Sequence, residues 1–158
     1  MGQTLKTASI VLVEDNPADV LLVRKALQEK GIKCQLTCFE DGEKALKNLS
    51  QQGRLAPDLI LLDLNLPGAD GVDVLRKICT IPRLSEVPIV ILTSSESPSD
   101  VQRTARIGAA RYIRKPSGLE WPRVPRSFST MERTIRSTGT NRSAADGFTS
   151  RLVSSAIP

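Results

Sequence analysis

The sequence places acidic, hydroxyl and ammonium side chains directly after short apolar segments that are candidates for buried strands. The side chains concerned are Glu14, Asp15, Asp63, Thr93 and Lys115. Parallel strands present their carboxyl ends at one edge of a sheet, and open α/β sheets bind their ligands at that edge. We therefore expect these five side chains, although far apart in the sequence, to form one site.

Three carboxylates in one site require a cation. At roughly 4 Å and an effective dielectric constant near 20, each pair of carboxylates repels by about 4 kcal/mol. Lys115 supplies one positive charge, and a divalent ion would supply two. Because the ligands are all oxygen atoms, a hard ion fits best, and we expect Mg²⁺, with Mn²⁺ as the alternative.

Asp63 is the best nucleophile among these residues. It stands between an apolar segment and the turn-forming residues 65–68, so its carboxylate can face both solvent and a metal ion. A carboxylate can attack phosphorus and form an aspartyl phosphate, while a metal ion and a lysine neutralise the phosphoryl oxygens. Thr93 could donate its hydroxyl to one of these oxygens, and the backbone carbonyl of Asn65 could complete the metal shell.

Histidine is absent from the sequence. This excludes nucleophiles that depend on a serine–histidine or cysteine–histidine pair, and it excludes zinc sites with imidazole ligands. It also excludes a role as a phosphohistidine carrier. The chemistry of this chain must therefore rest on carboxylates, hydroxyls and lysines.

Short segments rich in β-branched residues alternate with amphipathic segments over residues 8–116, the pattern of βαβ units and a parallel sheet. Almost continuous apolar runs, typical of strands buried on both faces, occupy residues 9–13, 59–62 and 87–92. Weaker candidates, suited to positions nearer a sheet edge, are residues 34–39 and 110–113.

Four helices are expected between these strands. Asn16 is a capping residue before a proline at the first helical position, Asp19 supplies negative charge in the first turn, and Gly31 ends that segment. The other helices are expected to begin at Asp41-Gly42, after Asp70-Gly71 and at Ser97-Pro98, with ends near Gly53 for the second and at Gly108 for the fourth. The sequence thus predicts an α/β fold, a flavodoxin-like doubly wound five-stranded parallel sheet, for which we adopt the strand order 2-1-3-4-5.

Four sequence segments together resemble the receiver domain of bacterial two-component response regulators. The segments are residues 13–16, 61–71, 91–95 and 112–116. The spacing also matches this family, with 30 residues from Asp63 to Thr93 and 22 more to Lys115. The resemblance covers about residues 9–116, and we place the receiver domain at residues 8–116.

The resemblance implies a role for each residue of the expected site. Asp63 would accept a phosphoryl group from a partner sensor histidine kinase, with Glu14 and Asp15 as the acidic metal pair. Asn65 would add its backbone carbonyl to the metal, alongside Asp63. Thr93 would be the switch hydroxyl and Tyr112 the aromatic switch residue. Lys115 would be the lysine of the site, followed by Pro116, whose peptide bond is usually cis in this family. Phosphorylation would then change protein–protein contacts at the face of the last strand.

Residues 64–68 and 93–95 are similar to the small stand-alone regulators that serve phytochrome-type kinases. This similarity implies a single-domain regulator without an output domain of its own. Such a regulator acts by contact with a downstream protein, which the sequence does not identify. The absence of an apolar run long enough to span a membrane and the odd number of cysteines favour a cytoplasmic protein with reduced thiols.

Residues 117–158 depart from the receiver pattern. Pro122 and Pro125 interrupt the region where the family has its fifth helix. The segment contains 8 Ser, 5 Thr and 6 Arg but no Lys, a composition that favours partial disorder. We expect an atypical tail that is partly disordered or replaces the fifth helix, and the sheet face beneath to be covered by this tail, a partner protein or a second copy in a homodimer.

Two other functions fit parts of the sequence. The formal net charge of +5 and the arginines of the tail suggest a DNA-binding response regulator, but no helix-turn-helix pattern follows residue 116. An aspartyl-nucleophile phosphatase would need a second acid two residues after Asp63, where this chain has Asn65. We therefore expect neither nucleic-acid binding nor turnover of free substrates, and the chain is not expected to be an enzyme in that sense.

Overall fold

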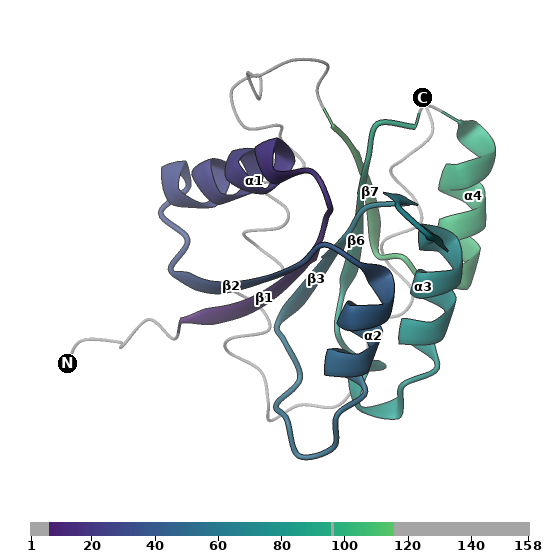
Figure 1. Cartoon of the computed structure of the whole chain (residues 1–158), viewed down its shortest axis with the longest axis horizontal. Helices are drawn as coiled ribbons and strands as arrows, with labels where there is room; N and C mark the ends of the chain where they lie inside the picture. Colours follow the sequence, from purple (N-terminus) through teal and green to yellow (C-terminus); the bar gives the residue numbers. More distant parts are fainter. Residues whose placement is uncertain (1–6, 96, 116–158) are drawn as a thin grey trace.

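The computed structural model describes residues 7–95 and 97–115, which form a five-stranded parallel sheet with helices on both faces (Figure 1). The strands of this sheet are β1 (Ala8–Val13), β2 (Cys34–Phe39), β3 (Leu59–Leu62), β6 (Ile89–Thr93) and β7 (Arg111–Arg114). Their order across the sheet is β2-β1-β3-β6-β7. Counted along the chain, this is the order 2-1-3-4-5, so the expected fold class and topology are confirmed.

The register of the strands aligns their carboxyl ends. Val13, the last residue of β1, lies opposite Phe39 of β2 and Leu62 of β3. Leu62 in turn lies opposite Ile91 of β6, and Thr93 lies opposite Arg114 of β7. The residues that follow each strand therefore leave the sheet at one edge, as parallel pairing requires.

Four α-helices connect the strands: α1 (Pro17–Glu29), α2 (Gly42–Leu49), α3 (Gly71–Cys79) and α4 (Pro98–Ile107). Three of them begin with side-chain caps that satisfy free backbone amides. Asn16 accepts a hydrogen bond from the amide of Ala18, Asp41 accepts from Glu43 and Lys44, and Asp70 accepts from Val72. A short 3₁₀ helix, η1 (Pro82–Leu84), precedes β6. The part of the chain that the structure describes contains no helix with the length and hydropathy of a membrane span.

The helices form two layers around the sheet, with α1 on one face and α2, α3 and α4 on the other (Figure 1). Alternate residues of one strand face the two layers. Ile10 and Leu12 of β1 belong to the core cluster that contains Leu27 of α1, whereas Val11 and Val13 belong to the cluster with residues of α2 and α3. Every residue of β3 and β6 is buried, which confirms that these apolar runs are central strands.

Some element boundaries differ from those expected. Strand β6 begins at Ile89 and not at Val87, because Pro88 has no amide hydrogen to donate to a neighbouring strand. Helix α2 ends at Leu49, with Ser50 as its C-cap, several residues before Gly53. Pro116 and the tail 117–158, for which an interrupted fifth helix was expected, lie outside the described residues.

A small antiparallel hairpin, which was not expected, follows the main strand β3. It consists of β4 (Asn65–Leu66) and β5 (Ala69–Asp70), joined by Pro67 and Gly68. Gly68 has a φ of 71°, and a proline followed by such a glycine is the signature of a type II turn. The hairpin leads the chain directly from the β3 edge into helix α3.

Gly71, at the first position of α3, lies against the backbone that carries Asp63. A Cβ atom on Gly71 would lie 2.4 Å from Leu64 Cα and 2.7 Å from the Asp63 carbonyl oxygen. Real Cβ atoms do not approach backbone atoms this closely. Only glycine therefore lets the start of α3 pack against this segment.

We predict that Gly71→Ala lowers the free energy of unfolding by about 2–3 kcal/mol, because the added methyl group forces the backbone apart. Gly68→Ala is the matched control, since a Cβ there meets no atom within 4 Å and costs only the strain of its positive φ, about 1 kcal/mol. Urea unfolding followed by circular dichroism measures both. Equal losses would show that the close approach at Gly71 does not matter.

Candidate functional site

Glu14 is held at the sheet edge by backbone pairing that continues past β1. Its amide donates to the Phe39 carbonyl at 2.9 Å. Its side chain is only 1% exposed, and Oε1 accepts a hydrogen bond from the Asn16 amide at 3.0 Å. A buried carboxylate is therefore fixed at the start of the loop that leads into α1. Asp15 follows it in an exposed position.

Asp63 occupies the corresponding position after β3. Its amide donates to the Val13 carbonyl at 3.0 Å, which ties it to the end of β1. The residue is 3% exposed, and Oδ1 accepts a hydrogen bond from the Asn65 amide at 3.0 Å. One carboxylate oxygen is thus oriented by the backbone, and the other, Oδ2, faces Lys115.

Lys115 brings the acidic residues together. Its amide donates to the Thr93 carbonyl at 2.8 Å, which fixes the chain just after β7. Its ammonium group donates to Glu14 Oε2, to Asp63 Oδ2 at 2.7 Å and to Asp19 Oδ2 at 2.9 Å. An ammonium group has three N–H donors. All three can therefore be used by carboxylates.

The charges of this cluster alter the acidity of its members. Burial raises the pKa of Glu14 above its usual value, and this effect outweighs the hydrogen bonds from Lys115 and Asn16, which lower it. Burial alone would lower the pKa of Lys115, but the hydrogen bonds to Asp63, Glu14 and Asp19 raise it well above its usual value. The lysine is thus held in its charged form by the acids around it.

The acids could also hold a metal ion. Glu14, Asp15 and Asp63 each offer a carboxylate oxygen, and these oxygens lie within 4.8 Å of one another. A set of oxygen ligands without nitrogen or sulfur suits Mg²⁺ or Mn²⁺. One ammonium group cannot neutralise three carboxylates, so a divalent cation would relieve the remaining repulsion. The structure brings together the three acids and the lysine that were expected to meet.

The side chains of Thr93 and Asn65 are joined by a hydrogen bond. Thr93, at the end of β6, is fully buried. Its hydroxyl oxygen accepts hydrogen bonds from the Asn65 side-chain amide and from the Ser95 backbone amide, both at 3.2 Å. The Asn65 amide also donates to Ser94 Oγ at 3.3 Å. With both acceptor positions used, the Thr93 hydroxyl keeps its proton for donation to another group.

Tyr112 connects the last strand to the loop that follows Thr93. It lies half-buried in β7, opposite Ile91 of β6. Its hydroxyl donates to the Ser95 carbonyl at 3.1 Å, and burial raises the pKa of the phenol. A movement of the Thr93–Ser95 backbone would therefore also move the hydrogen-bond acceptor of Tyr112.

Asp19 and the side chain of Asn65 were not expected to take part in the site. Asp19 was interpreted as an acid favoured by the first turn of a helix, and Asn65 as the source of a backbone carbonyl. A sequence signal for Asp19 does exist. Helical side chains tilt toward the helix N-terminus, so an acid in the first turn of a helix that begins at this edge points back toward the site.

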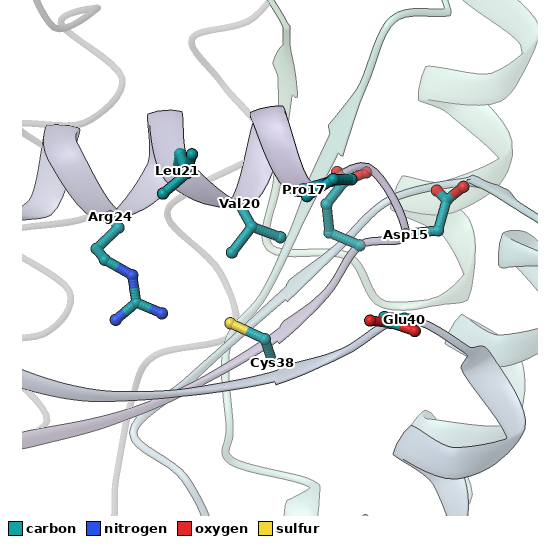
Figure 2. A pocket seen from close by; sticks show the side chains of 8 residues that line it. Asp15, Pro17, Val20, Leu21, Arg24, Cys38 and Glu40 are labelled. Carbon is teal, nitrogen blue, oxygen red and sulfur yellow. The ribbon is translucent and has the colours of Figure 1, made fainter.

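A cavity of about 380 Å³ adjoins the acidic residues between α1 and β2. Figure 2 shows Val20, Leu21 and Arg24 of α1 on one side of it and Cys38 of β2 on the other. Glu14 and Asp15 also line this cavity, but Asp63 and Lys115 do not. The cavity therefore lies beside the acid pair and does not enclose the expected reaction centre.

Comparison with known proteins gives consistent matches. The family model of the response regulator receiver domain matches residues 10–121. Response regulator Rcp1 of Synechocystis sp. is 40% identical over 115 residues, which make up 70% of this chain and 78% of Rcp1. The solved structure of the phosphorylated cyanobacterial phytochrome response regulator RcpA has a TM-score of 0.72 and 34% identity, and the match covers 84% of this chain and 96% of that one.

Two similar solved structures contain a metal ion. The Mn²⁺-bound form of Rcp1 has a TM-score of 0.66 and 33% identity, with 89% of this chain and 99% of that chain covered. The receiver domain of the sensor histidine kinase PA1611 from Pseudomonas aeruginosa carries a magnesium ion in its active site cleft. It has a TM-score of 0.64 and 26% identity, with 86% of this chain and 100% of that chain covered.

The raised pKa of Glu14 predicts a pH-dependent effect of Glu14→Gln. Where the folded state holds a proton that the unfolded state has lost, stability falls as pH rises. For Glu14 this window begins near its usual pKa of 4.5 and ends at the raised folded value. The glutamine side chain has no such proton to lose and keeps an acceptor oxygen, so the stability of E14Q relative to the wild type should increase from about pH 4.5 to about pH 7.

Urea unfolding at both pH values, in buffer with a chelator, measures this difference in the free energy of unfolding. Glu43→Gln serves as the control, because Glu43 is an exposed acid at the start of α2. A difference between E14Q and the wild type that stays constant or shrinks as pH rises would contradict the prediction.

Proposed function

The chain belongs to the response regulator receiver family, and we propose that it is a phosphorylation switch whose phosphoacceptor is Asp63. The observation that carries this proposal is the contact of the Lys115 ammonium with Asp63 Oδ2, beside two further carboxylates of a possible metal site. A nucleophile, a fixed positive charge and a cation-binding acid pair are the parts that phosphoryl transfer to a carboxylate needs.

The metal ion of this proposal is Mg²⁺, with Mn²⁺ able to replace it. Glu14, Asp15 and Asp63 would hold it, and the backbone carbonyl of Asn65 would join them. When bound, the ion neutralises negative charge on the transferred phosphoryl group. The metal-bound structures of Rcp1 and of the PA1611 receiver domain support the assignment, as does the all-oxygen character of the acid trio.

In the proposed reaction, a carboxylate oxygen of Asp63 attacks the phosphorus of a phosphohistidine in a partner kinase. The new bond joins oxygen to phosphorus, and the bond between phosphorus and the imidazole nitrogen of the kinase breaks. The electron pair of that bond returns to the imidazole. Lys115 then donates to a phosphoryl oxygen in place of Asp63 Oδ2, so the positive charge follows the negative charge as it moves.

Thr93 and Tyr112 would convert phosphorylation into a change of shape. Thr93 would donate its hydroxyl to a phosphoryl oxygen, which draws the end of β6 toward Asp63. The backbone of Ser95 is hydrogen-bonded to the hydroxyl groups of both Thr93 and Tyr112, so this movement would reach the last strand. The face formed by β7 would then gain or lose affinity for a partner protein.

We further propose that the phosphoryl donor is a sensor histidine kinase of the phytochrome type. The similarity to the phytochrome response regulator RcpA and to Rcp1 supports this choice.

In this proposal residues 8–116 are the receiver and residues 117–158 a separate tail. The output is contact with a downstream protein or a second copy of the chain, and Asn65 in place of a second acid argues against turnover of free phosphate esters.

We predict that the wild-type protein, incubated with acetyl phosphate and Mg²⁺, gains the mass of one phosphoryl group, and that Asp63→Asn abolishes this gain. An amide at position 63 cannot act as the nucleophile. Excess chelator should reduce the rate by at least about tenfold, since the repulsion between carboxylates and donor is then uncompensated. Intact-protein mass spectrometry follows the reaction.

Asp73→Asn is the control for the loss of one aspartate, because Asp73 is exposed on α3 and pairs with Arg76 of its own helix. This variant should be phosphorylated at the wild-type rate. A wild-type protein that gains no phosphoryl group, or a D63N variant that gains it at an unchanged rate, would refute the proposal.

A further inference from the structure

We propose that Asp19 is a positioning residue that holds the ammonium group of Lys115 in place while Asp63 takes up a phosphoryl group. This inference rests on the function proposed above and adds to it a fourth carboxylate. Asp19 lies in the first turn of α1, and its Oδ2 accepts a hydrogen bond from Lys115 at 2.9 Å. It is not one of the three acids whose oxygens converge on a possible metal ion.

The three carboxylates around Lys115 differ in what happens to them during the reaction. Asp63 loses its negative charge when an oxygen atom becomes bonded to phosphorus. Glu14 would share its charge with the metal ion. Asp19 alone of the three partners keeps an undivided negative charge for the ammonium throughout, because it neither reacts nor belongs to the metal trio.

Lys115 needs such an anchor because its side chain is long and flexible. A lysine carries its charge on a four-carbon chain with several rotatable bonds. Once Asp63 is phosphorylated, a contact with Glu14 alone would fix one of its three N–H donors. The Asp19 contact fixes a second donor and leaves the third to point at the phosphoryl group.

The surroundings of Asp19 distinguish it from an ordinary acid at a helix start. Asp73 holds the same position in the first turn of α3, is 54% exposed and pairs with Arg76 of its own helix. Asp19 is 25% exposed and pairs with a lysine that follows the far strand β7, 96 residues along the chain. A role limited to the helix dipole would not require this contact across the sheet.

Asp19→Asn tests the proposal, because asparagine keeps the shape of aspartate and removes its charge. We expect the initial rate of phosphoryl uptake from acetyl phosphate to fall about tenfold, the effect of one lost charge-assisted contact in the reacting state. Asp73→Asn, which removes a charge from the same position of another helix, should leave the rate unchanged. The Mg²⁺ affinity of D19N, measured by calorimetry, should not weaken.

The ammonium resonance of Lys115 in ¹⁵N-labelled protein reports on its positioning directly. A lysine held by carboxylates exchanges its protons slowly, so we expect the ammonium protons of D19N, which keeps only Glu14 and Asp63 as charged partners, to exchange faster than those of the wild type and of D73N. Proton exchange in D19N that is no faster than in the wild type, an unchanged or faster rate of uptake, or a loss of rate that comes with weakened Mg²⁺ binding would overturn the role of Asp19.

The same experiment separates this proposal from the proposed function. If the wild type takes up no phosphoryl group, the proposed function fails and the role of Asp19 fails with it. If the wild type is phosphorylated and D19N is phosphorylated equally fast, only the role of Asp19 fails.

Discussion

The contact between one ammonium group and three carboxylates is the interaction on which the site depends. Glu14 and Asp63 are almost completely buried. Their carboxylate oxygens lie within 4.8 Å of each other, and two buried carboxylates at such a distance repel each other strongly. Lys115 compensates part of this repulsion and remains charged because of it. Without this lysine the repulsion between the acids that follow β1 and β3 would be uncompensated, and the expected nucleophile would lose its position.

The sheet topology explains why the compensating residue is a lysine. The order β1-β3-β6-β7 puts Lys115 three strands away from Glu14, about 14 Å at the usual spacing between strands. Only a long side chain can approach this separation, and the hydrogen bond from the Lys115 amide to the Thr93 carbonyl fixes the backbone from which this side chain extends. Arginine is also long, but its N–H donors are fixed in one plane, whereas an ammonium group can rotate to point its three donors at carboxylates in different directions.

The parts of this structure that repeat along the sequence could be predicted from it. Continuous apolar runs identified β3 and β6, and capping residues such as Asn16 and Asp41 identified the helix starts. Together they predicted a parallel sheet. Glu14, Asp63 and Lys115 each follow a strand of that sheet, so their convergence at one edge could be predicted from the topology. Asp19 was missed although its position in the first turn of α1 directs it toward this edge. The amide of Asn65 was missed because a side-chain contact between distant residues leaves no periodic pattern. The hairpin β4–β5 was missed because strands of two residues are too short to show alternation.

The buried charges of the site lower its stability, and they also determine how the site can respond to a new anion. A well-packed apolar core has one favourable arrangement, whereas Lys115 has three acidic partners for three donors and can exchange one of them with little loss. Thr93 is similar, since its hydroxyl is held by Asn65 and Ser95 through its acceptor positions and keeps its proton free. A new anion beside Asp63 would therefore find one donor, Lys115, that can exchange a partner and a second donor, Thr93, whose proton is free. The polar groups that lower stability at this edge are those that allow it to change state, while the apolar layers around β3 and β6 stay fixed.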